Sequence, residues 1–123
     1  MAGEPRGGSH SYQRLGREFG ALRMEYRNGM PARLMKLGML WSRLASGSAG
    51  VQAVADLLLE LHDIAGSAGS HGLPQLGEAA QAAEYYLAAA TARGARLGAL
   101  EERHFNRLLG ELRIASQPPR PRR

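Results

Sequence analysis

Residues 61–73 read LHDIAGSAGSHGL, and this stretch carries the most specific pattern in the chain. It ends a predicted helix whose apolar residues recur every three or four positions. His62 lies about 80° around that helix from the centre of the apolar face, so we expect its ring to reach water. Ala65, Gly66 and Gly69 follow on the adjoining surface and have almost no side chain. The sequence therefore predicts open space beside an accessible imidazole.

An imidazole in such a place is suited to carrying a phosphoryl group. Free imidazole titrates near pH 6.5, so much of it is neutral and nucleophilic at cellular pH. It can attack a phosphoryl donor and form a labile phosphoramidate. A lone histidine at a helix edge is more often an ordinary surface residue, so the small residues around His62 are what favour this interpretation. The Gly-rich run lacks the Lys-Ser/Thr pair and the preceding strand of a nucleotide-binding loop.

The rest of the chain predicts helices nearly throughout. Apolar residues step by three and four along five segments, at about residues 11–27, 31–45, 51–69, 74–93 and 97–115. Asn28-Gly29 should end the first helix, and a proline opens the second and the fourth, where its missing N–H costs nothing. Valine and isoleucine occur only twice each, which disfavours strands. We therefore expect an all-α fold, an up-down antiparallel four-helix bundle with the first helix as an additional N-terminal cap.

Composition and charge set the domain organisation and exclude some functions. Residues 11–116 should form one bundle domain, between a disordered N-terminus at 1–10 and a disordered, basic, Pro-rich tail at 117–123. The 123 residues contain no cysteine, and no apolar run approaches the ~20 residues that span a bilayer. We expect a cytoplasmic protein without a membrane segment. The net charge of +5 is uneven, because residues 51–92 contain no Lys or Arg, which argues against a uniformly basic nucleic-acid binder.

Two stretches of the chain resemble a known family. Residues 61–84, LHDIAGSAGSHGLPQLGEAAQAAE, look like the signature of histidine-containing phosphotransfer (Hpt) domains. Residues 30–44, MPARLMKLGMLWSRL, look like the helix that precedes the histidine helix in that family. The resemblance covers about residues 12–115 and implies that His62 is the phosphoryl acceptor. By the same resemblance, Gly66 supplies clearance for the phosphoryl group.

The resemblance also implies which residues surround His62. The site would be lined by Ala65, Gly66, Ser67 and Gly69, and the candidates for a docking surface are Leu59, Asp63, His71 and Arg43. Many family members have Lys three residues after the histidine, where its charge can steady the phosphoryl oxygens. This chain has Ala65 there. We therefore expect the stabilising charge to come from another helix, for example from Arg43, or from the docked protein, and we expect a less stable phosphohistidine.

The leading hypothesis is a stand-alone phosphorelay carrier that is not an enzyme by itself. Its partners would be receiver domains of response regulators and hybrid histidine kinases, with Mg²⁺ on the receiver, no cofactor on this chain and a monomeric state. The spacings of the four histidines match no metal site; His71 is expected in a turn and His104 in packing. One alternative is an interaction module of the same fold that carries no phosphate, supported by the missing Lys. Another is a small basic nucleic-acid-binding helical protein, supported by the basic tail.

Overall fold

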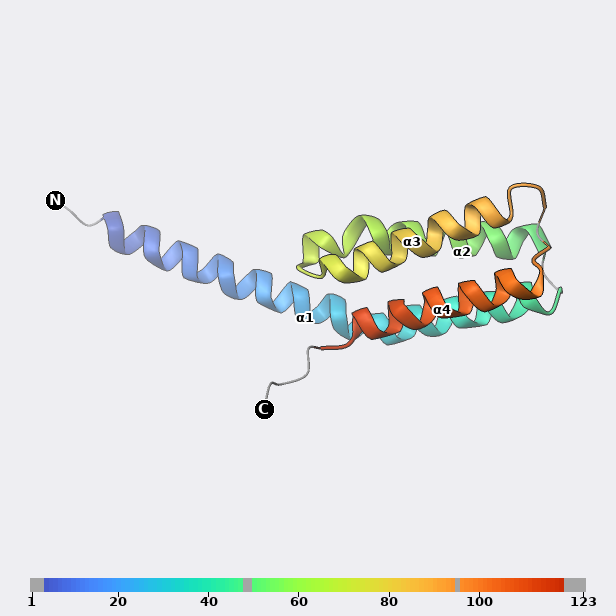
Figure 1. Cartoon of the computed structure of the whole chain (residues 1–123). Helices are drawn as coiled ribbons and strands as arrows, with labels where there is room; N and C mark the ends of the chain where they lie inside the picture. Colours follow the sequence, from blue (N-terminus) through green and yellow to red (C-terminus); the bar gives the residue numbers. More distant parts are fainter. Residues whose placement is uncertain (1–3, 48–49, 95, 119–123) are drawn as a thin grey trace, which may run out of the picture.

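The computed structural model describes residues 4–47, 50–94 and 96–118, and this part of the chain is helical with no strand. Four α-helices and one short 3-10 helix follow one another along the chain (Figure 1). Their bounds are α1 Glu4–Ala45, α2 Gly50–Ser67, η1 Gly69–His71, α3 Pro74–Ala90 and α4 Ala99–Ser116. The all-α prediction is confirmed.

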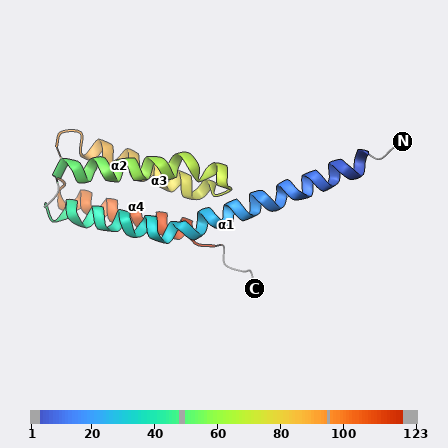
Figure 2. The same cartoon turned by 180° about the vertical axis from the view of Figure 1, so that it is seen from behind.

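The bundle consists of α2, α3, α4 and the C-terminal half of α1. These segments lie side by side, whereas the N-terminal half of α1 projects beyond the end of the bundle (Figures 1 and 2). The core is made of apolar side chains from all four α-helices, because each helix presents one apolar face to the others. Its largest fully buried side chains are Phe105, Met30, Leu37, Leu57, Leu61, Ile64, Leu76, Leu87 and Leu112.

The prediction of two separate helices before residue 46 was wrong, because α1 runs unbroken through Pro31. A proline inside a helix removes one backbone hydrogen bond. Packing overrides that local cost: Met30 just before the proline and Leu37 after it are each only 1% exposed. The first helix is therefore not a separate cap on the bundle. It also begins at Glu4, inside the stretch 1–10 for which we expected disorder.

The turn between α2 and α3 agrees more closely with the prediction. Pro74 is the first residue of α3, as expected for a residue without a backbone N–H. Gly72 has a φ of +77°, a left-handed conformation that favours glycine, and it closes η1 with a hydrogen bond from its N–H to the carbonyl of Gly69. The helix α3 ends at Ala90, three residues before the predicted end.

The C-terminal helix packs as the sequence predicted. His104 is half-buried, and its ring centroid lies 4.3 Å from that of Tyr86. The expected tail at 117–123 is described only as far as Pro118, so residues 119–123 lie outside the described part. None of the described helices combines the length and the apolar character needed to cross a membrane.

Candidate functional site

His62 lies in the C-terminal half of α2, on the side of the helix that adjoins α3. Its side chain is 71% exposed, and its Nδ1 atom lies 2.9 Å from Oε2 of Glu84 on α3. The Glu84 side chain is only 19% exposed, so packing restricts its position. The structure thus presents an accessible imidazole whose orientation is held by a carboxylate.

This contact determines which ring nitrogen is free. An ionised carboxylate only accepts hydrogen bonds, so Nδ1 of His62 carries the proton that it donates to Glu84. Nε2 then carries the lone pair on the far side of the ring. Because the ring is largely exposed, an incoming partner can reach that atom.

Glu84 was not among the site residues predicted from the sequence, although its position along the hairpin indicates the pairing. The α2–α3 hairpin turns near Leu73, and His62 and Glu84 are each 11 residues from it. Residues at equal distances from the turn of an antiparallel helical hairpin lie opposite each other. A count of this kind would have paired the two residues.

Small residues leave space beside His62. A Cβ atom built on Gly66 or on Gly69 would meet nothing within 4 Å, so both positions are open. Ala65 is half-buried and packs against the core instead. On α3, Gly77 is buried, and a Cβ there would come within 3.5 Å of the Ala65 carbonyl oxygen. Gly77 therefore lies where α3 packs against the end of α2, next to the site.

Ser67 connects three elements at the end of α2. Its hydroxyl donates to the Asp63 carbonyl at 2.7 Å, so the Tyr26 hydroxyl of α1, also 2.7 Å away, is the donor to Ser67. His71 bonds the Ser67 carbonyl through Nδ1 at 2.8 Å and stacks on the Tyr26 ring with centroids 4.3 Å apart. This network secures the turn against α1, and it engages one nitrogen of His71.

The structure places the other docking candidates in two regions. Leu59 is 61% exposed and Asp63 is exposed, and both lie within one turn of His62 on α2. Arg43 is in the last turn of α1, at the opposite end of the α1–α2 hairpin. It is seven residues beyond Lys36, which contacts Glu60, so it lies about 10 Å further from the level of His62. The structure therefore does not bring Arg43 to His62.

Two cationic side chains of α1, Arg33 and Lys36, face α2 and form ion pairs with Glu60. Arg33 Nε lies 2.8 Å and Lys36 Nζ lies 3.2 Å from its two carboxylate oxygens. Burial alone would raise the pKa of Glu60, but the hydrogen bonds and charges of Arg33 and Lys36 outweigh it and hold the pKa below its ordinary value. This cluster stabilises the α1–α2 contact. It does not supply the charge that a Lys in place of Ala65 would provide.

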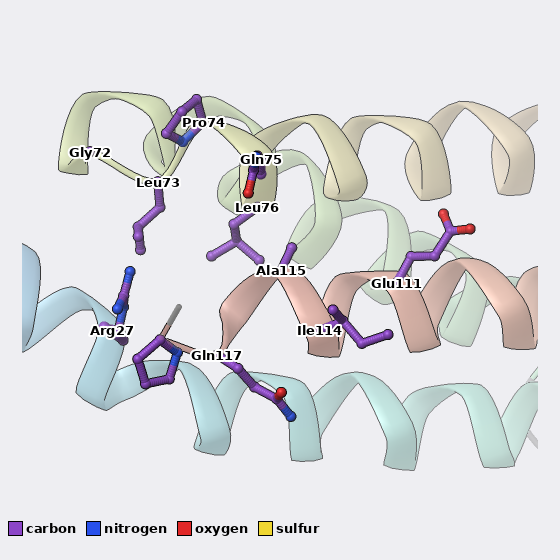
Figure 3. Close-up of a pocket in the computed structure, with 11 residues that line it drawn as sticks. Arg27, Gly72, Leu73, Pro74, Gln75, Leu76, Glu111, Ile114, Ala115 and Gln117 are labelled. Carbon is purple, nitrogen blue, oxygen red and sulfur yellow. The ribbon is translucent and has the colours of Figure 1, made fainter. Parts of the chain in front are cut away.

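A hollow of about 790 Å³ lies away from His62, at the end of the bundle (Figure 3). Its lining comes from Arg27 of α1, residues 72–76 at the start of α3, and residues 111–118 around the end of α4. The Nε atom of Arg27 is buried there without a hydrogen-bond partner. Among the residues that the structure describes, no three His, Asp or Glu side chains gather as metal ligands.

Comparison with known proteins gives the family. The family model of the Hpt domain matches residues 21–115, which is most of the chain. A search of curated proteins and a search of solved structures gave no significant match. Hpt domains are phosphocarrier modules, not enzymes; they function in two-component signalling and interact with receiver domains. Because the family model matches residues 21–115 and the chain folds as a helical bundle, this chain belongs to the Hpt domain family.

Proposed function

We propose that this chain relays phosphoryl groups between receiver-domain aspartates through Nε2 of His62. The observation that carries the proposal is the contact between Nδ1 of His62 and Glu84 on an otherwise exposed ring. That contact holds the proton on Nδ1 and leaves the Nε2 lone pair facing solvent. The open space at Gly66 gives a docked partner access to the same side of α2.

The transfer step follows from this geometry. The Nε2 lone pair attacks the phosphorus of a phospho-aspartate on the receiver, the P–O bond to the aspartate breaks, and the carboxylate leaves with the electron pair. The imidazole becomes a phosphorylated cation, and Glu84 stabilises it through Nδ1–H. Reversal on a second receiver completes the relay. In this proposal the receiver brings Mg²⁺, this chain needs no cofactor, and the exchange takes place in the cytoplasm.

Label transfer tests the proposal. Phosphorylated receiver domains from the same organism are incubated with the wild type, with His62→Gln and with the matched control His104→Gln. We expect acid-labile label on the wild type and on His104→Gln, and none on His62→Gln. Transfer of label to His62→Gln, or binding of a cognate receiver by the wild type without any labelling, would contradict the proposal.

The second candidate is an interaction module that binds receivers without carrying phosphate. It is favoured by Ala65, which leaves the site without the Lys found in many family members. If the chain is a carrier, a cation at this position should prolong the life of the phosphohistidine. We expect Ala65→Lys to lengthen the half-life several-fold, while Val51→Lys, at an exposed position 11 residues before His62, leaves it unchanged. An equal half-life in Ala65→Lys and wild type would contradict this account of Ala65.

A further inference from the structure

The hollow at the end of the bundle is large enough to hold a small molecule. Its volume of about 790 Å³ is in the range of ligand pockets, and it lies between α1, the start of α3 and the end of α4 (Figure 3). None of His62, Glu84 and Gly66 is part of its lining. The proposed relay therefore gives this hollow no role.

Arg27 of α1 brings an unpaired positive charge to the hollow. Its Nε atom is buried without a hydrogen-bond partner. Its two terminal nitrogens form no hydrogen bond or ion pair within the described part of the chain, but they are not buried, so they can donate to a molecule in the hollow. Because the side chain is half-buried, water compensates this charge incompletely, which favours contact with an anion.

The acidic residue nearest in role, Glu111 of α4, does not neutralise Arg27. Glu111 also lines the hollow, but it is exposed and points away from Arg27 (Figure 3). The ion pairs of the described residues involve Glu60 and Glu84 and leave out both Arg27 and Glu111. The guanidinium thus remains available to a ligand.

The remaining surface of the hollow is mostly apolar. Ile114 of α4 is 70% exposed, so its side chain meets water unless a ligand covers it. The other apolar residues of the lining are Leu73, Pro74, Leu76, Ala115 and Pro118. A ligand that matches this surface needs an apolar body as well as a negative charge.

The first turn of α3 adds donors that reinforce Arg27. Leu73 before the helix supplies no side-chain cap. The backbone N–H groups of Gln75 and Leu76 have no backbone acceptor within the described part of the chain, and both residues line the hollow. Free N–H groups and the positive end of the helix dipole both favour a negative charge nearby.

We propose that this hollow binds a small organic acid, a carboxylate with an apolar body. The two terminal nitrogens of Arg27 form a planar fork that matches the two oxygens of a carboxylate. The apolar body then covers Ile114 and Leu73. An inorganic anion would satisfy Arg27 but would leave the apolar surface uncovered.

The bound acid should stabilise the bundle. It would contact α1, α3 and α4 together, and it can do so only in the folded chain. A ligand that binds only the folded state raises the midpoint of thermal unfolding as its concentration increases. This proposal does not rest on phosphotransfer, and His62→Gln should bind the acid as the wild type does.

Calorimetric titration of the full chain tests the ligand class with three probes. Octanoate carries both the charge and the apolar body, 1-octanol carries only the apolar body, and acetate carries essentially only the charge. We expect octanoate to bind and to raise the midpoint of thermal unfolding, and each of the other two to bind at least about tenfold more weakly. A chain that does not bind octanoate, or that binds acetate or 1-octanol equally well, would overturn the proposal.

Variants test the place of binding. Arg27→Gln should weaken octanoate binding at least about tenfold, because it removes the charged donor. The matched control is Arg17→Gln, which changes an exposed arginine of the same helix outside the hollow and should leave binding unchanged. Unchanged affinity in Arg27→Gln would contradict the proposal.

A second variant covers the case in which Arg27→Gln disturbs the packing of α1. Ile114→Glu changes an exposed position, so the fold should be kept, and its carboxylate should repel the ligand. We expect loss of octanoate binding with an unchanged far-ultraviolet circular dichroism spectrum. Leu100→Glu, at an exposed position of the same helix outside the hollow, is the control. Equal effects of Ile114→Glu and Leu100→Glu would place the binding elsewhere and refute this site.

Discussion

At the scale of single residues, the proposed phosphoryl acceptor, His62, is oriented by one contact. Glu84 fixes the proton on Nδ1 from 2.9 Å away, and the rest of the ring is in solvent. A histidine held in this way has one defined nucleophilic atom without being enclosed in a pocket. In the proposed relay, the docked receiver supplies the remainder of the active site.

Removing the carboxylate at position 84 should slow phosphotransfer. Glu84→Ala loses a hydrogen bond to a charged group, so we expect the rate of label transfer to fall on the order of tenfold. Glu84→Gln keeps an acceptor oxygen, so its rate of label transfer should lie between those of Glu84→Ala and the wild type. Single-turnover labelling measures the effect, with the exposed Glu78→Ala on the same helix as control. Equal rates for Glu84→Ala and Glu78→Ala would show that the contact is not used.

The substitution Gly66→Ala should change the stability of the fold and the rate of phosphotransfer in opposite directions. Gly66 is helical, and an added Cβ meets nothing within 4 Å, so Gly66→Ala should raise the free energy of unfolding by about 1 kcal/mol. The same methyl group would occupy space next to His62 that a docked receiver needs. We expect urea unfolding to show the gain in stability and label transfer to show a slower rate. A more stable variant with unchanged transfer would mean that the partner does not enter this space.

Among the helices, α1 departs most from local expectation. Asn28, Gly29 and Pro31 predict a break, yet the helix continues because both sides of the proline are packed against α2 and the turn. Near the same level Glu60, which is 8% exposed, ties α2 to Arg33 and Lys36 of α1. Tertiary contacts of this kind outweigh the cost of one missing hydrogen bond.

The Glu60 cluster should make the fold sensitive to acid. Because the folded-state pKa of Glu60 is lowered from 4.5, its ionised form contributes stability above that pH, and this contribution is lost as the pH falls through the folded-state value. Glu60→Gln should lower the free energy of unfolding at neutral pH by about 2 kcal/mol and flatten its dependence on acidic pH. Urea unfolding at a series of pH values measures both, with Glu78→Gln as control. An unchanged slope in Glu60→Gln would assign the acid sensitivity to other groups.

In the whole molecule, α1 and α4 are joined through the single tryptophan. The indole N–H of Trp41 donates to Asn106 Oδ1 at 2.7 Å, and its ring lies 4.7 Å from that of Phe105. Phe105 is fully buried. Fluorescence of Trp41 therefore reports on the closure of the bundle.

Truncation of Phe105 should loosen the whole bundle. We expect Phe105→Ala to cost about 3–5 kcal/mol, a large part of the stability of a domain of this size, and to shift Trp41 emission to longer wavelength. Leu100→Ala on the same helix removes a side chain that is 76% exposed and should change stability by less than about 0.5 kcal/mol. Similar losses in the two variants would argue against a core centred on Phe105.

Local sequence was sufficient to predict much of the site. The small residues beside His62, the helix start at Pro74 and the turn at Gly72 all depend on side-chain size or on backbone geometry within a few residues. Such features do not need a partner from elsewhere in the chain. For that reason the all-α class and the accessible histidine could be predicted correctly before the fold was known.

Contacts between distant residues were decided only by the tertiary structure. The pairing of His62 with Glu84 depends on the register of α2 against α3, and the use of Arg33 and Lys36 by Glu60 depends on the register of α1 against α2. The continuity of α1 through Pro31 depends on packing energy that no local pattern contains. A sequence determines its helices through periodicity and steric limits, whereas charge partners and unbroken helices are determined by which surfaces meet when the helices pack.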